Sequence, residues 1–375
     1  MTIPGVIDVH VHFRVPGGEH KEDWSHGTQA AYAGGVVYVC DMPNTTPAIT
    51  TAAGVRDKAM EIDRTAPHAI AHGLYIGATE DNLEEIQAAD RDGLICGVKV
   101  YFGTSTGHLT MNSLPALRAL MEARLGVPIV IHAEDDAVIA AARAAYEAEH
   151  GAITDIAAHS DIRSRDAAVS ALETILALVK ETAATNVHIT HISTAQEVEL
   201  IRAAKQAGLS VTCDVTPHHL TFTVADYAQH GTRIRCNPPI REQADVDALW
   251  EGLRDGTIDI VASDHAPHTL EEKAATEYDA IPSGVPGVQT LLPVLVDGVL
   301  SDKLSWEKLV AVTSTNPSQR FQIPVRGEVV IDTEAVTQIQ DSDQQSLCGW
   351  TPLSGMTLRG AIISTSIDGA LYYQV

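Results

Sequence analysis

The chain has 375 residues, 45% of them hydrophobic and 20% charged, which is ordinary for a globular protein with a sizeable core. Its 49 acidic and 25 basic residues give a formal net charge of -24, which argues against a nucleic-acid partner or an anionic membrane surface. The five cysteines form no CxxC pair, the N-terminus lacks signal-peptide features, and no apolar run reaches the roughly 18 residues of a membrane span, so we expect a cytoplasmic protein without a disulfide framework.

Short β-rich segments alternate with amphipathic helical segments along most of the chain. The helical segments repeat their apolar residues with the helical period of about 3.6 residues and mostly end near glycine. They include 51–66, 114–126, 167–183 and 195–208. Eight repeats of this alternation predict a parallel sheet and, at this length, an α/β fold of the (β/α)8 TIM-like barrel type. An open doubly wound sheet is the alternative, but neither GxGxxG nor a Walker motif follows the first strand. The predicted strands are 5–13, 36–43, 69–78, 97–103, 128–135, 186–193, 210–220 and 259–267.

The first predicted strand carries two histidines in "DVHVHFR". His10 and His12 are two residues apart, so both rings point to one side of the strand, into the barrel mouth where the active sites of such barrels lie. A lone histidine is best interpreted as a hydrogen-bonded structural side chain, whereas this pair favours a metal site. The histidines that we interpret as isolated and structural are His20, His26, His68, His72, His108, His150, His159 and His230.

The fourth predicted strand, "GVKVYFG", contains a lysine among apolar residues. Burial disfavours the ammonium form of Lys99, and a neutral amine can react with carbon dioxide to give a carbamate, which is a carboxylate. At this strand end the carbamate could bridge two metal positions. A salt bridge across the barrel, with Asp264 as one candidate partner, explains the lysine about equally well.

Three later strands end in metal-ligand residue types: His132, His191 and Asp264. Together with the first two histidines they suit Zn²⁺, and two ions fit better than one because a zinc usually takes three protein ligands and a water. His188 lies three residues before His191, so we expect it to face the helices.

His218 and His219 in "TPHHL" lie near the mouth, where a role in supporting the ligands and a purely structural role are equally supported.

Beyond about residue 325 the helical pattern stops, and "GEVVIDTEAV" and "LRGAIISTSIDGALYYQV" are predicted to form short strands. We interpret residues 1–324 as the barrel and 325–375 as a C-terminal β-containing extension packed on it, without a site of its own.

Over nearly its whole length the chain resembles the dihydroorotases, which are cyclic amidohydrolases of the amidohydrolase superfamily. The resemblance rests on the opening "DVHVHFRVPGG" and, in the family's order, on "MPNT", "GVKVYFG", "IHAED", "HITHIST", "TPHHL", "NPPIR", "ASDHAPHT" and "GVPGVQTLLP". The ending "GWTPLSGMTLRG" is similar to the dihydroorotase domain of the animal multifunctional pyrimidine-synthesis protein.

This resemblance implies reversible hydrolysis of (S)-dihydroorotate to N-carbamoyl-L-aspartate in de novo pyrimidine biosynthesis, by a zinc-bridged hydroxide with Asp264 as general acid and base. It implies two zinc ions, one on His10, His12 and Asp264, the other on His132 and His191, with carboxylated Lys99 as the bridge. The implied substrate-binding residues are Arg14, Asn44, His268, Asn237, Thr104 and Thr106.

From the residues alone, Arg14 just beyond the histidine pair is a natural bidentate clamp for a carboxylate, with a surface salt bridge as the alternative. Without the resemblance, Asn44 in "PNTTP" is better interpreted as capping a turn. The segment 103–109 is explained equally well as a loop that closes over substrate and as an ordinary βα loop. Two departures from the family are Val15, where glutamate is usual, and the short segment before His10, which puts a second domain in doubt.

Other functions remain open at this stage. Allantoinase is the main alternative, although allantoinases tend to carry asparagine in place of Arg14, and dihydropyrimidinase is disfavoured because dihydrouracil has no carboxylate for Arg14. A non-catalytic scaffold for aspartate transcarbamoylase would typically lose metal ligands, and this chain keeps them. A homodimer and an association with aspartate transcarbamoylase are both open.

Overall fold

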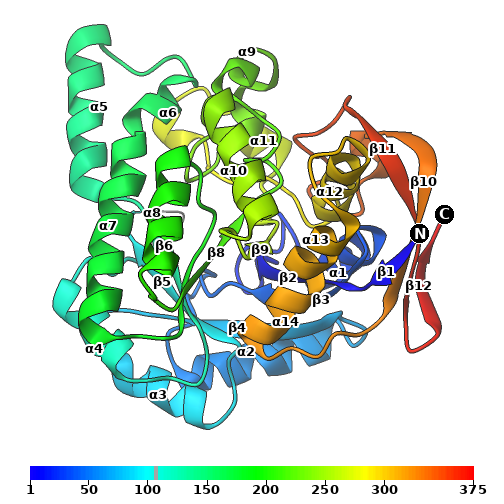
Figure 1. Ribbon diagram of the computed structural model, residues 1–375, viewed down its shortest axis with the longest axis horizontal. Coiled ribbons are helices and arrows are strands. Elements are labelled where there is room, and N and C mark those ends of the chain that lie inside the picture. Colours follow the sequence, from blue (N-terminus) through cyan, green and yellow to red (C-terminus); the bar gives the residue numbers. More distant parts are fainter. Residues whose placement is uncertain (105–108) are drawn as a thin grey trace.

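The computed structural model describes residues 1–104 and 109–375, so Thr106 and His108 lie outside the described residues. Eight parallel strands form one sheet in sequence order, surrounded by helices (Figure 1). This confirms the predicted barrel, and each predicted strand segment contains one of its strands. The strands are β2 Val6–Val11, β3 Val36–Asp41, β4 Ala71–Gly77, β5 Gly97–Phe102, β6 Ile129–Ala133, β7 Val187–Ile189, β8 Val211–Val215 and β9 Ile260–Val261.

The barrel closes between the end of β9 and β2. Val11 forms an isolated parallel bridge with His265, and the His12 N–H donates to the His265 carbonyl oxygen at 2.8 Å. Asp264 directly precedes His265, so the closure brings its carboxylate to the two histidines of the first strand.

Helices cover the outer face of the barrel, and the main hydrophobic core lies between them and the strands. The four helical segments named from the sequence correspond to α2, α4, α7 and α8. The helices are α1 Trp24–Ala33, α2 Ala52–Thr65, α3 Leu83–Arg91, α4 Leu114–Glu122, α5 Asp136–His150, α6 Ala158–Ile162, α7 Arg165–Thr182, α8 Ala195–Gln206, α9 Tyr227–His230, α10 Gln243–Asp255, α11 Leu270–Lys273, α12 Leu291–Leu300, α13 Trp306–Val310 and α14 Asn316–Phe321.

The strand register places Lys99, Val130, His188 and Thr212 side by side, because each is paired with the next across neighbouring parallel strands. Residues paired in this way point to the same face. The His188 ring lies 5.7 Å from that of Phe321, which also packs on the inward-facing Tyr75. His188 therefore faces the barrel interior, and the expectation that it faces the helices is wrong.

The physical reason is that β7 ends at Ile189, so the two-residue alternation does not extend to His191. The backbone of His191 has a φ of 41°, and this left-handed residue turns the chain so that both rings point inward.

A second, antiparallel sheet of four strands stands beside the barrel, next to α12 (Figure 1). It combines residues from both ends of the chain, because β1 pairs with β10. The division of the chain into domains at residue 324 stays a prediction. None of the described helices is long and apolar enough to cross a membrane. The strands are β1 Thr2–Pro4, β10 Glu328–Gln338, β11 Thr357–Ile367 and β12 Ala370–Gln374.

Candidate active site

A cavity at the carboxyl ends of the barrel strands gathers most of the residues selected from the sequence. It is also lined by Tyr101, Ala266, Ser283 and Gly284. His268 lies behind one wall, whereas Thr104 is exposed and does not line the cavity. The selected residues that line it are His10, His12, Arg14, Asn44, Lys99, His132, His191, Asn237 and Asp264.

His10, His12 and Asp264 form the first group of candidate metal ligands. Asp264 Oδ1 lies 3.2 Å from His10 Nε2 and 3.1 Å from His12 Nε2. Two ligand atoms of a tetrahedral zinc lie roughly 3.3 Å apart, given metal–ligand bonds of about 2.0–2.1 Å. These spacings therefore fit a common cation.

The hydrogen bond of His12 to Asn44 supports the same interpretation. His12 Nδ1–H donates to Asn44 Oδ1 at 2.7 Å, which leaves the lone pair on Nε2. That lone pair then faces a carboxylate oxygen, and two acceptors this close need a cation between them. Burial lowers the pKa of His10 and His12, so both rings are neutral, which is the metal-binding form.

His132 and His191 form the second group. His132 Nδ1 and His191 Nε2 lie 3.1 Å apart, while His132 Nε2 lies 3.0 Å from Glu134 Oε2. A carboxylate at this distance favours the proton on Nε2 of His132, which leaves the lone pair on Nδ1, the nitrogen beside His191. Burial lowers the pKa of both rings, which are neutral as well. A carboxylate behind a histidine is the usual way in which proteins orient a metal ligand.

Lys99 is fully buried, and its Nζ has no hydrogen-bond partner among the described residues. The described carboxylates, Asp264 included, form no salt bridge with it, which removes that alternative for this structure. The amine lies 5.0 Å from the centre of the Tyr101 ring. Burial lowers its pKa to about 8, so a substantial neutral fraction exists near neutral pH. A buried amine without a partner fits conversion to a carbamate that binds cations.

Three residues of the site have left-handed backbones: Arg14 with a φ of 62°, His191 with 41° and Asp264 with 45°. Such conformations cost a non-glycine residue roughly 1–3 kcal/mol and persist where surrounding contacts enforce them. Asp214 Oδ1 accepts the His191 N–H at 2.6 Å, and Asp8 Oδ1 accepts the Ser263 N–H at 3.0 Å, just before Asp264. Buried carboxylates thus fix the backbone from which the ligands project.

Arg14 lines the cavity, and His268 lies beside its guanidinium. Arg14 Nε donates to the Pro267 carbonyl oxygen at 3.1 Å, and Nη2 lies 3.3 Å from His268 Nε2. No described carboxylate forms a salt bridge with Arg14, so the surface salt bridge considered from the sequence is not observed. The guanidinium keeps donors for a ligand.

Asn237 is oriented by a histidine that the sequence interpretation left aside. His159 is buried, its Nε2 lies 3.0 Å from both Asn237 Oδ1 and the Cys236 carbonyl oxygen, and its Nδ1 lies 2.8 Å from the Tyr278 hydroxyl. The interpretation of His159 as isolated is therefore wrong. No local signal could reveal these contacts, because they join segments far apart in the chain.

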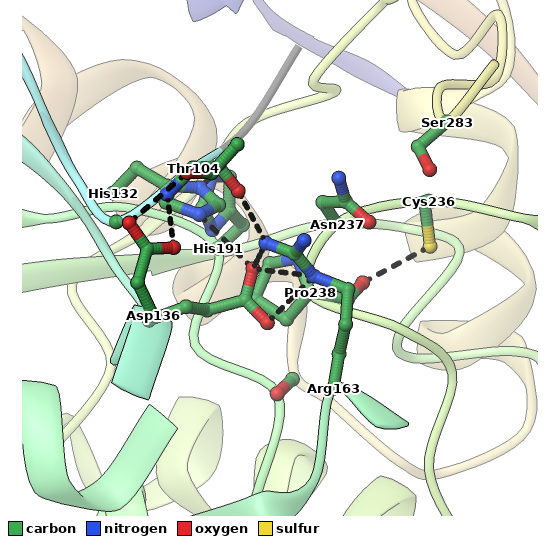
Figure 2. A network of polar contacts seen from close by, with 12 residues as sticks. Thr104, His132, Asp136, Arg163, His191, Cys236, Asn237, Pro238 and Ser283 are labelled. Carbon is green, nitrogen blue, oxygen red and sulfur yellow. Dashed lines mark hydrogen bonds and ion pairs between the residues drawn. The ribbon is translucent and has the colours of Figure 1, made fainter. Parts of the chain in front are cut away.

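A further network that the sequence interpretation missed connects His132 to the segment near residue 104 (Figure 2). Arg163 pairs with Glu134 and also donates to the Thr104 carbonyl oxygen at 2.8 Å. The Thr104 hydroxyl donates to Asp136 Oδ2 at 3.0 Å rather than pointing into the cavity. Glu134, two residues after His132 in "IHAED", was the one available sequence signal.

The chain is similar to known proteins over most of its length. The model described as the amidohydrolase family matches residues 1–371. A dihydroorotase from Halobacterium salinarum is 38% identical over 365 residues, covering 94% of this chain and 82% of that protein. The multifunctional protein CAD of Squalus acanthias is 34% identical over 380 residues, covering 100% of this chain but 15% of that protein. The structure of L-hydantoinase (dihydropyrimidinase) from Arthrobacter aurescens has a TM-score of 0.94 at 27% identity, covering 100% of this chain and 85% of that one. These findings confirm the resemblance noted from the motifs.

Proposed function

The chain belongs to the amidohydrolase family, and from this premise we propose that it is a dihydroorotase. The reaction is the reversible hydrolysis of the ring amide of (S)-dihydroorotate to N-carbamoyl-L-aspartate. The observation that carries the proposal is the Arg14 guanidinium, which lines the same cavity as the two histidine groups and Lys99 and has no described carboxylate as an ion-pair partner. A cation beside a hydrolytic centre suits a cyclic amide that bears a carboxylate.

The donor atoms support two zinc ions. One ion would be held by His10, His12 and Asp264, and the other by His132 and His191, with Lys99 as a carbamate between them. Imidazoles and carboxylates at these spacings are suitable zinc ligands. When bound, zinc supplies a Lewis acid and activates water near neutral pH.

The other residues bind the substrate and move its protons. Arg14 and Asn44 bind the substrate carboxylate, and His268 keeps the guanidinium in place. Asn237, whose oxygen is occupied by His159, offers its amide N–H groups to a ring carbonyl. Asp264 accepts a proton from the attacking water and delivers it to the ring nitrogen that leaves. Burial raises the pKa of Asp264, but the neighbouring His12, His218 and Lys99 outweigh this and hold it below its usual value, so Asp264 is ionised as the base.

The test is the turnover of dihydroorotate, allantoin and dihydrouracil by protein prepared with zinc and bicarbonate. We expect turnover of dihydroorotate alone. Arg14→Asn should lower kcat/KM by roughly 10- to 100-fold, because a hydrogen bond to a charged group contributes about 1.5–3 kcal/mol.

Arg56→Asn is the matched control, since Arg56 forms an exposed ion pair with Asp92. Preference for allantoin or an unaffected Arg14→Asn variant would contradict the assignment of the substrate. Zinc-loaded protein without any turnover would instead favour the scaffold function.

Hydantoinase activity is a second candidate, because the similarity to L-hydantoinase extends over the whole chain. An unsubstituted hydantoin carries no carboxylate for Arg14, so we expect its turnover to be slower than that of dihydroorotate. The match within a multifunctional protein supports an association with aspartate transcarbamoylase, which gel filtration of the two mixed proteins tests.

A further inference from the structure

A second group of metal-ligating side chains lies outside the residues used above. His218, His219 and Cys236 each bring one ligand atom to within 4.8 Å of those of the others. All three side chains are buried. Both histidines follow β8, while Cys236 directly precedes Asn237 of the cavity wall (Figure 2).

His218 has a ring nitrogen that is open to a ligand. Its Nε2 is buried and has no hydrogen-bond partner among the described residues. Buried polar atoms are nearly always paired, so a nitrogen left open beside a thiol and a second imidazole needs an explanation. The two rings are neighbours, with centroids 4.6 Å apart.

His219 and Cys236 are held by contacts that a cation could replace. His219 Nε2 donates to the Pro238 carbonyl oxygen at 3.0 Å, so Nδ1 is the acceptor of the Thr216 hydroxyl, 2.7 Å away. A cation reaches Nδ1 when the Thr216 side chain turns about its Cα–Cβ bond, which moves the oxygen off the lone pair and gives up its contact with the His219 N–H, 3.3 Å away. The Cys236 thiol makes only a weak contact, with Sγ 3.2 Å from the same Pro238 oxygen.

We propose that His218, His219 and Cys236 form a third cation site, which takes a thiophilic divalent ion such as Zn²⁺ or Cd²⁺. Two imidazoles and a thiolate select such ions over Mg²⁺ and Ca²⁺, which prefer oxygen ligands. On binding, the S–H bond of Cys236 breaks, the sulfur–metal bond forms and the proton passes to solvent, with no change of oxidation state. Burial lowers the pKa of His219 to about 4 and keeps both rings neutral, as ligands must be.

The experiment titrates zinc-loaded full-length protein with Cd²⁺ and follows the ultraviolet charge-transfer band of a cadmium–thiolate bond, together with bound cadmium by equilibrium dialysis. The donor groups proposed for catalysis contain no sulfur, so the band does not report them. We expect the wild type to show the band and to bind one cadmium more than Cys236→Ser. His218→Asn should also lose the extra ion, and it serves as the second test if Cys236→Ser does not fold.

Cys213→Ser is the matched control, because Cys213 is equally buried and its Sγ contacts only the Thr257 carbonyl oxygen among the described partners. This control should keep both the band and the extra cadmium. Equal cadmium binding by the wild type and Cys236→Ser, or the absence of a band in the wild type, would overturn the proposal.

Occupation of this site should also affect substrate binding, because Cys236 adjoins Asn237. Excess Cd²⁺ is expected to raise KM for dihydroorotate in the wild type but not in Cys236→Ser. This consequence rests on the proposed function, whereas the thiolate band and the cadmium count do not, so the two can fail separately.

Discussion

Lys99 is a lysine buried in the protein interior, an environment that disfavours its charged form. Its amine is buried without a hydrogen-bond partner among the described residues, and burial lowers its pKa to about 8. Lys58 is also buried but differs in one respect, because its Nζ donates to Asp41 Oδ2 at 2.5 Å. Lys58 therefore has a carboxylate partner, whereas the Lys99 amine has no partner among the described residues and is free to react.

The carbamate on Lys99 should therefore depend on pH. Because its pKa is lowered from 10.5 to about 8, the neutral fraction rises as the pH passes through 8 rather than through 10.5. In metal-free protein supplied with ¹³C-bicarbonate, the carbamate signal in ¹³C NMR should grow between about pH 7 and 9. Lys99→Ala should abolish this signal. A signal that persists in Lys99→Ala would place the carbamate elsewhere, and its absence from the wild type would refute the bridging carboxylate.

At the scale of elements, the site depends on ionic contacts between segments that follow different strands. Arg163, between α6 and α7, pairs with Glu134 after β6 and contacts Thr104 after β5. Burial raises the pKa of Glu134, but Arg163 and His132 outweigh it and hold that pKa well below its usual range. This carboxylate therefore contacts the candidate metal ligand His132 and also links the segments that follow different strands.

Removing the buried Arg163–Glu134 ion pair should lower the free energy of unfolding far more than removing an exposed ion pair. Arg163→Ala leaves the buried Glu134 charged and without its cationic partner, which should lower the free energy of unfolding by roughly 3–5 kcal/mol. Arg143→Ala removes an exposed pair with Asp279 and should change it by about 0–1 kcal/mol. Urea denaturation of both variants measures the difference. Equal effects of the two substitutions would show that Arg163 contributes little to holding the elements together.

At the scale of the whole molecule, stability depends on the negative net charge and on a sheet that both ends of the chain share. With a net charge of -24, the acidic side chains repel one another in the compact folded state. The N-terminal strand β1 and the C-terminal strands β10 to β12 belong to the same second sheet, in which Thr2 of β1 is the partner of Val330 of β10.

Salt should stabilise the protein as a whole. Raising the ionic strength from roughly 0.01 M to about 0.15 M shortens the Debye length from about 30 Å to about 8 Å and screens the repulsion among surface acids. We expect a higher Tm in calorimetry at the higher ionic strength. A lower Tm would mean that the exposed ion pairs, which salt also screens, contribute more to stability than the net repulsion costs.

The sequence by itself was sufficient to predict the barrel and most of the residues that were expected to gather in its cavity. Alternating segments define the strands and helices, and a strand-end histidine or aspartate reaches the mouth whichever helices pack outside. Asn44 became a candidate only because it stands in a recognised motif, whereas Arg14 also stood out by its position just beyond the histidine pair. Lys99 was conspicuous because its charge interrupts an apolar run.

Only the tertiary structure decided the direction of His188, the support of His132 by Glu134 and Arg163, and the orientation of Asn237 by His159. It also placed Cys236 beside His218 and His219. The reason is physical: local sequence patterns report which way a side chain points while its strand continues, and β7 ends before His191. Contacts between segments that follow different strands depend on how the barrel closes, and closure is a property of the whole chain.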